Sequence, residues 1–141
     1  MKALYLETSA ILTWLLGEES ADGVRRAVDR SDLVVTSSLA FAEAERALVR
    51  AERARRIRGA DAQRLRGMLE RARSGWMSMA VTEEVLVRAA SPFPAEPVRT
   101  LDAIHLATAL AFVKALPELS LMSFDRRILE NAEALGVARE G

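Results

Sequence analysis

Short apolar runs alternate with longer segments of helical periodicity along the whole chain. The runs at residues 2–6, 33–36, 76–81 and 119–124 have the length and composition of buried strands. Between them, apolar positions recur at the spacing of one helix face. Strands that alternate with helices are typical of a parallel sheet covered on both faces. We therefore predict an α/β fold in one domain over residues 1–141, with four or five parallel strands flanked by helices.

Capping residues and glycines divide the helical segments. Ser37 or Ser38, Thr82 and Asp125 are predicted to cap helices. Gly59 is predicted to divide the two helices of a hairpin at about residues 38–74, and the proline-rich residues 91–97 are predicted to be a loop. The predicted helices cover residues 9–16, 20–30, the two halves of the hairpin, 82–90, 101–116 and 126–135, and a last short strand begins at 137.

Composition limits the function classes that the chain can belong to. It contains no cysteine, which excludes disulfides and cysteine-based zinc sites. No segment approaches the length of a membrane span, and the N-terminus shows no signal-peptide pattern. We therefore expect a cytoplasmic protein with no membrane partner. The formal net charge is +0, so bulk charge predicts no nucleic-acid binding.

Four carboxylates stand at the ends of predicted strands or near the starts of helices. Glu7 follows the first strand, Glu43 lies in the helix after the second, Asp102 starts a helix, and Asp125 follows the fourth strand. The carboxyl ends of parallel strands lie on one edge of a sheet, where helix starts also gather. Oxygen ligands at such an edge suit Mg²⁺ or Mn²⁺. Such a site can activate water and stabilise charge during phosphodiester cleavage.

Each of these carboxylates also has a simpler interpretation. Asp125 could only cap a helix, Asp102 could only favour the helix dipole, and Glu43 could face solvent. Glu7 is harder to explain in this way, because it directly follows a buried strand.

The same residues carry a resemblance to a known family. Residues 4–10 (LYLETSA) are similar to the opening strand of PIN-domain ribonucleases, and residues 37–43 (SSLAFAE) are similar to their second motif. Residues 99–109 (RTLDAIHLATA) are the most specific match, and residues 121–127 (LMSFDRR) are similar to the closing motif. The chain resembles the toxins of VapBC-type toxin–antitoxin pairs over essentially its whole length.

This resemblance implies a PIN-like α/β/α domain that hydrolyses RNA with the help of Mg²⁺ or Mn²⁺. It implies catalytic roles for Glu7, Glu43, Asp102 and Asp125, a small antitoxin as partner, and a homodimer. One position departs from the family pattern. The family usually has aspartate where this chain has Glu7, and the extra methylene leaves open whether the site keeps full activity.

We expect Glu7, Asp102 and Asp125 to hold the metal, with Glu43 as a further ligand or as the group that orients the attacking water. The hydroxyls of Thr8, Ser9 and Ser123 are candidates for fixing the carboxylate rotamers. His105 is the only histidine, and we interpret it as a packed or hydrogen-bonded helix residue.

RNA contacts are expected away from the acidic site, because carboxylates repel phosphates. Residues 46–73 hold ten arginines against three acids, and Arg46, Arg50 and Arg53 are the first candidates for phosphate contacts. A solvated helical face explains the same pattern equally well.

Two other functions compete with the nuclease. A phosphoryl-transfer fold of receiver or haloacid-phosphatase type would need an aspartate at position 7 and a late lysine, whereas the only lysines are Lys2 and Lys114. A PIN-like module that has lost activity and binds RNA or a protein partner is supported by the glutamate at position 7.

Overall fold

The computed structural model describes all residues 1–141 and contains one sheet of five parallel strands in the order β3-β2-β1-β4-β5. The predicted parallel sheet is confirmed, including the short last strand. The strands are β1 (Ala3–Leu6), β2 (Leu33–Ser37), β3 (Met77–Met79), β4 (Ser120–Met122) and β5 (Ala138–Arg139).

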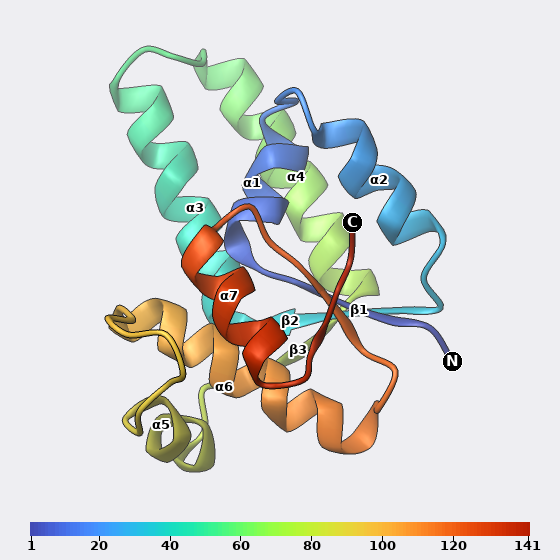
Figure 1. The fold of residues 1–141 in the computed structure, drawn as a ribbon. Helices are drawn as coiled ribbons and strands as arrows, with labels where there is room; N and C mark the ends of the chain where they lie inside the picture. The colour runs from blue at the N-terminus through green and yellow to red at the C-terminus, as the bar shows by residue number, and fades with distance from the viewer.

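Seven helices connect and cover the strands (Figure 1). Their positions agree with the predicted segments, with ends that differ by a few residues. The helices are α1 (Thr8–Leu15), α2 (Ala21–Asp29), α3 (Ser38–Arg53), α4 (Gly59–Gly75), α5 (Glu83–Ala89), α6 (Thr100–Ala115) and α7 (Arg126–Ala134).

The central strand β1 is buried on both faces, which explains its continuous apolar run. Ala3 and Tyr5 pack into one core with α6 and α7. Leu4 and Leu6 point to the opposite face, into a second core with α1, α2, α3 and α4. Side chains alternate across a strand, so four consecutive apolar residues serve two cores. The result is the three-layer α/β/α arrangement that was predicted.

Helices α3 and α4 form the predicted hairpin and pack against each other (Figure 1). The turn between them differs from the prediction, because Gly59 is the first residue of α4 and lies outside the turn. Arg55 instead adopts the left-handed conformation with φ 59°. The amides of Arg55 and Arg56 donate to the carbonyls of Glu52 and Ala51, which is a Schellman ending of α3.

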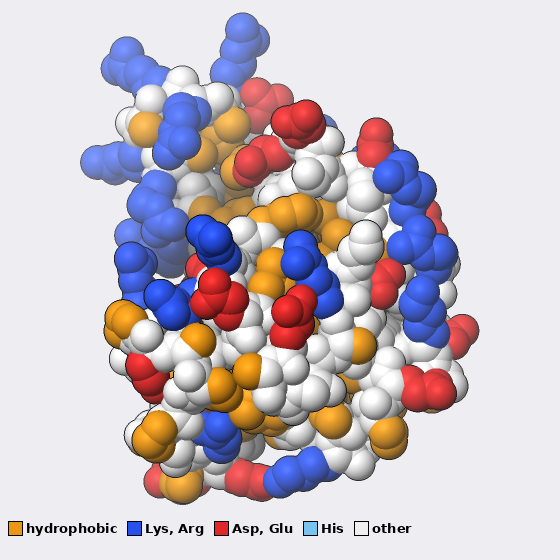
Figure 2. Space-filling model, in the orientation of Figure 1, with side chains coloured by type: hydrophobic (Ala, Val, Ile, Leu, Met, Phe, Trp, Pro, Cys, Tyr) orange, Lys and Arg blue, Asp and Glu red, His pale blue; other side chains and the backbone are white.

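The arginines of the hairpin differ in their surroundings. In α4, Arg64 and Arg73 pair with acids one helical turn away, and Arg66 lies 3.7 Å from both Glu45 and Glu52 of α3. The arginines of α3 and of the turn make no ion pair, and basic side chains gather over this end of the molecule (Figure 2). The ion pairs of the protein involve other arginines and leave these six without an acidic partner: Arg46, Arg50, Arg53, Arg55, Arg56 and Arg58.

Two tryptophans tie α1 to the end of α4. The rings of Trp14 and Trp76 lie 5.8 Å apart between centroids, and both pack against the core on that face. Trp76 follows α4 directly, so the third strand begins one residue later than predicted, at Met77. No helix combines the length and the hydrophobicity that crossing a lipid bilayer requires.

Candidate active site

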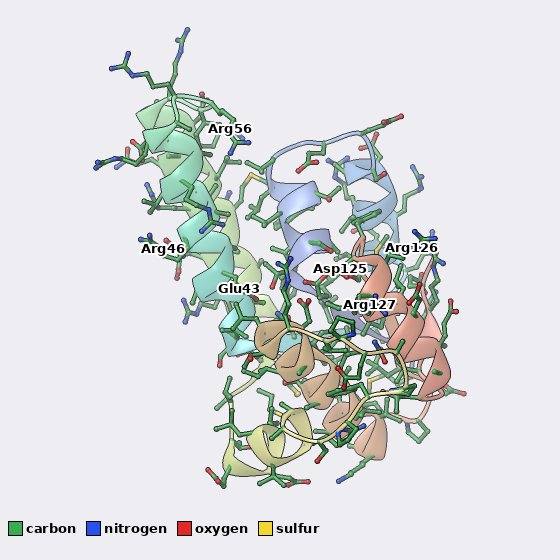
Figure 3. The ribbon with its side chains drawn as sticks, turned by 60° about the vertical axis from the view of Figure 1, so that its left-hand side comes forward. Glu43, Arg46, Arg56, Asp125, Arg126 and Arg127 are labelled. Atoms are coloured by element: carbon green, nitrogen blue, oxygen red, sulfur yellow. The ribbon has the colours of Figure 1, made fainter.

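The predicted carboxylates come from the edge of the sheet where the parallel strands end. Glu7 directly follows β1, and Asp125 caps α7 shortly after β4. Glu43 lies near the start of α3, and Asp102 lies in the first turn of α6. Figure 3 shows Glu43 on α3 and Asp125 at the start of α7, with Arg46 farther along α3.

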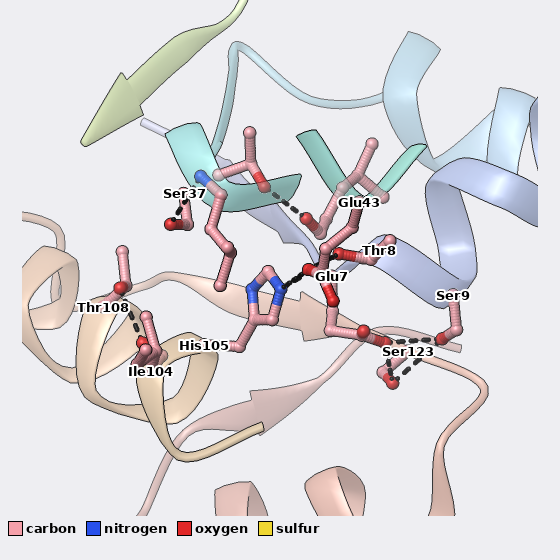
Figure 4. Close-up of polar contacts among 12 residues, drawn as sticks. Glu7, Thr8, Ser9, Ser37, Glu43, Ile104, His105, Thr108 and Ser123 are labelled. Carbon is pink, nitrogen blue, oxygen red and sulfur yellow. Dashed lines mark hydrogen bonds and ion pairs between the residues drawn. The ribbon is translucent and has the colours of Figure 1, made fainter. Parts of the chain in front are cut away.

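Glu7 is held by two hydroxyls. Ser9 Oγ and Ser123 Oγ donate to the same oxygen, Glu7 Oε1, over 2.5 Å and 2.6 Å (Figure 4). The backbone amide of Glu7 also donates to Met122 O at 3.1 Å, which extends the pairing of β1 with β4. Only 5% of Glu7 is exposed, so these contacts fix its carboxylate in one position.

Asp125 has a structural role that leaves part of its carboxylate free. Its Oδ1 accepts from the amides of Arg127 and Ile128, so the predicted helix cap is confirmed. Its Oδ2 makes no hydrogen bond within the protein. A cap uses one oxygen of the carboxylate, so capping and metal binding are compatible at this residue.

Electrostatics link three of the carboxylates. Burial raises the pKa of Asp102 above its ordinary value, and the charges of Asp125 and Glu7 raise it further. Asp102 forms no hydrogen bond or ion pair through its side chain. Arg99 and His105 lower the pKa of Asp102 but do not offset these effects, so part of the negative charge at this edge is uncompensated, which is the situation that a cation relieves.

The donor set fits a hard divalent cation in its chemistry, since every donor is a carboxylate oxygen. The four carboxylates do not meet at one point, because no three acidic or histidine side chains lie close enough to form a metal-binding group. Mg²⁺ usually takes only one or two carboxylates and keeps several waters, so a three-ligand group is not required.

Glu43 does not face solvent freely, so that simple interpretation is wrong. Its Oε1 accepts from Thr8 Oγ1 at 2.6 Å and lies 2.7 Å from His105 Nε2. Burial opposes ionisation of Glu43, but the hydrogen bonds from His105 and Thr8 outweigh it and hold the pKa of Glu43 below its ordinary value. Glu43 is therefore an ionised and oriented carboxylate.

Comparison with known proteins identifies the fold. The family model described as PIN domain matches residues 4–134, a range that includes all four carboxylates. The chain belongs to the PIN-domain family.

Similar proteins show to which group of PIN domains the chain belongs. The chain is 36% identical over 138 residues to Ribonuclease VapC46 of Mycobacterium tuberculosis, with 98% of this chain and 96% of that protein covered. It is 34% identical to Ribonuclease VapC35 of the same organism, with 96% and 93% covered. The predicted resemblance is confirmed, and the chain is a VapC-type PIN domain.

A solved structure supports the fold. The crystal structure of Mycobacterium tuberculosis VapC20, described as a Sarcin-Ricin loop cleaving toxin, superposes with a TM-score of 0.64 and covers 96% of each chain. Its sequence identity to this PIN domain is 16%, so this likeness concerns the fold.

Two of the three candidate RNA contacts of this PIN domain lie beside Glu43. Arg46 and Arg50 line a surface pocket together with Glu43 and Leu101. Arg53 lies farther along α3 and does not line it. The structure thus brings two of the three candidate arginines next to the acidic edge.

Sequence reasoning missed the partners of His105. The prediction that it is a packed or hydrogen-bonded helix residue is confirmed, since it is 0% exposed and hydrogen-bonded. Its bond to Glu43 was not predicted. One signal was present in the sequence, because Tyr5 in a buried strand needs a polar partner for its hydroxyl, and the chain has a single histidine.

Proposed function

We propose that this chain is a metal-dependent ribonuclease and the toxin of a toxin–antitoxin pair. The observation that carries the proposal is the set of four carboxylates at one edge of a VapC-type PIN domain, three of them coupled electrostatically around Asp102. Its relatives VapC46 and VapC35 are named ribonucleases, which supports RNA as the substrate.

In this proposal Glu7, Asp102 and Asp125 would hold Mg²⁺ or Mn²⁺, partly through waters. The cation would supply charge stabilisation and an activated water for phosphodiester hydrolysis. Ser9 and Ser123 keep the Glu7 carboxylate in place. Glu43 orients the attacking water through Oε2, the oxygen that Thr8 and His105 leave free.

The decisive experiment is cleavage of a structured RNA by the purified protein, with and without divalent cations. We expect cleavage that depends on Mg²⁺ or Mn²⁺ and stops when a chelator is added. Equal cleavage in the chelator would contradict the metal-dependent mechanism.

Mn²⁺ is expected to raise the melting temperature of the wild-type protein. A ligand at about a hundredfold excess over its Kd stabilises a folded protein by about 2.7 kcal/mol, which raises Tm by several degrees. Differential scanning calorimetry measures the shift. Asp102→Asn should reduce it clearly, and an unchanged shift in that variant would place the cation elsewhere.

A second function remains supported by a specific observation. The carboxylates do not form a ready three-ligand group, and position 7 carries glutamate. Both features are compatible with a PIN-like module that binds RNA or a protein partner without cutting. Binding of Mn²⁺ with no RNA cleavage would favour this function over the nuclease.

Arg46 and Arg50 are expected to bind RNA phosphates. Replacing both by glutamine should weaken RNA binding and reduce the slope of log K against log salt by about 0.7 for each single-strand phosphate that the protein no longer neutralises. Fluorescence anisotropy at several salt concentrations measures this slope. Arg64→Gln with Arg73→Gln is the matched control, because these arginines on α4 are paired. Equal weakening in both double variants would show that only net charge matters.

The proposed function also implies partners and a location in the cell. We propose a small antitoxin protein as partner, a homodimer in solution and a cytoplasmic location. Sedimentation velocity of the purified protein tests the dimer directly, and co-expression with the product of a neighbouring short reading frame tests the antitoxin.

A further inference from the structure

We propose that His105 is a positioning residue that orients the carboxylate of Glu43 through its Nε2–H, with Tyr5 fixing the ring from the opposite side. This inference rests on the proposed function, because Glu43 acts on RNA only if the chain is a nuclease. The bond between the two side chains can nevertheless be tested without activity.

The contacts of His105 use both ring nitrogens. Nε2 lies 2.7 Å from Glu43 Oε1 and 2.9 Å from Thr8 Oγ1 (Figure 4). Nδ1 lies 2.8 Å from the hydroxyl of Tyr5. The Tyr5 and His105 rings meet edge to face with centroids 6.1 Å apart. The imidazole of His105, on α6, therefore contacts the central strand β1 on one side and the α3 residue Glu43 on the other.

The chemistry of these partners decides where the proton lies. An ionised carboxylate only accepts hydrogen bonds, so Nε2 must carry the hydrogen that points to Glu43. In a neutral imidazole with its hydrogen on Nε2, Nδ1 is the acceptor, and the hydroxyl of Tyr5 lies 2.8 Å from it and can donate. Donation then runs in one direction, from Tyr5 to His105 to Glu43.

This arrangement has a consequence for the two oxygens of Glu43. Thr8 and His105 both donate to Oε1, which fixes the rotamer of the side chain. The side chain of Glu43 is 24% exposed and lines the pocket that also contains Arg46 and Arg50. Without the His105 donor, Glu43 would keep a single hydroxyl partner and could rotate into this pocket. His105 therefore controls where the free oxygen points.

Two substitutions separate this role from simple packing. In His105→Gln, the amide nitrogen can replace Nε2 as donor to Glu43. In His105→Asn, the shorter amide can replace Nδ1 beside Tyr5 and leaves Glu43 without that donor. We expect His105→Asn to lower kcat by about 10- to 100-fold, the range for losing a group that orients a site residue. KM for RNA should stay unchanged, and His105→Gln should recover most of the loss. If both variants lose kcat equally, and the loss follows their loss of Tm, the proposal is overturned.

A double-mutant cycle tests whether His105 acts through Glu43. In a Glu43→Ala background, His105→Asn should lower kcat no further, because the carboxylate that it orients is absent. Effects that multiply independently would show that His105 supports the fold instead.

The single histidine also gives a readout that needs neither metal nor RNA. The ¹⁵N chemical shifts of the imidazole in the metal-free full-length protein report which nitrogen is protonated. We expect the proton on Nε2, and a shifted Nε2 signal in Glu43→Ala but not in Arg46→Gln. A proton on Nδ1 alone overturns the proposal. Absence of RNA cleavage by the wild type would refute the proposed function, and these spectra would still decide whether His105 holds Glu43.

Discussion

Asp102→Asn is expected to lower RNA cleavage by about 10²-fold or more, the loss seen when one electrostatic group of a catalytic site is removed. Asparagine keeps the size of the side chain and removes the charge. The rate under saturating Mg²⁺ or Mn²⁺, compared with wild type, measures the effect. Background cleavage of equal size in both proteins would contradict the nuclease function for this chain.

The same substitution is expected to stabilise the metal-free protein. Burial and the charges of Asp125 and Glu7 raise the pKa of Asp102, so ionisation of this carboxyl opposes folding. Removing it should increase the free energy of unfolding by about 1 kcal/mol or less, because solvent screens a partly exposed group. A variant that loses activity while gaining stability cannot be explained by misfolding.

The pH dependence of this gain has a defined sign. A carboxyl with a raised folded-state pKa binds its proton more tightly in the folded protein, so wild type loses stability as pH rises through that range. Below the ordinary aspartate pKa of about 3.9 the two proteins should differ little, and at neutral pH the difference should be complete.

Asp29→Asn is the matched control for both measurements, because Asp29 is exposed at the end of α2. It should leave RNA cleavage unchanged and should not reproduce the gain in the free energy of unfolding. A gain of the same size in this control would mean that net charge, and not the acidic edge, is responsible.

The features that the sequence predicts correctly are those set by local chemistry. Apolar runs predict the strands, and Asp125 is recognised as a cap because it stands between a strand and a helix. The carboxylates are placed at one edge because parallel strands all end on the same side. None of these inferences needs the packing of side chains that are distant in sequence.

The pairing of side chains across the site depends on that packing and was not predictable. Thr8 and Ser9 are neighbours in sequence, yet Thr8 bonds Glu43 and Ser9 bonds Glu7. Consecutive residues of a helix point about 100° apart, so α1 directs its two hydroxyls to different carboxylates. The contact of His105 with Glu43 likewise depends on how α6 packs against α3 and β1.

Glu7→Asp is the second substitution for which we expect a large effect. Ser9 and Ser123 both donate to Glu7 Oε1, so their positions suit the length of glutamate. Aspartate is shorter by one methylene and would withdraw the carboxylate from these hydroxyls. A misplacement of about 1 Å can reduce a catalysed rate by about 10²-fold, and we expect a loss of this order in kcat.

Glu7→Gln is the control that separates charge from length. Its amide oxygen can accept from the same two hydroxyls, so the position of the side chain is kept while the charge is lost. Mn²⁺ should therefore raise the Tm of Glu7→Gln less than that of Glu7→Asp, which keeps its carboxylate. An equal Tm shift in the two variants would show that Glu7 does not hold the cation.

A double-mutant cycle between Glu7 and Ser123 tests whether the positions of the Ser9 and Ser123 hydroxyls favour glutamate over aspartate at position 7. In a Ser123→Ala background, Glu7→Asp should reduce kcat less than in wild type, because one of the two hydroxyls that suit the longer side chain is gone. Glu7→Asp with activity above wild type would mean the opposite, that glutamate weakens the site. In that case the hydroxyls of Ser9 and Ser123 would hold the carboxylate away from its best position, and the same Ser123→Ala variant should itself be more active.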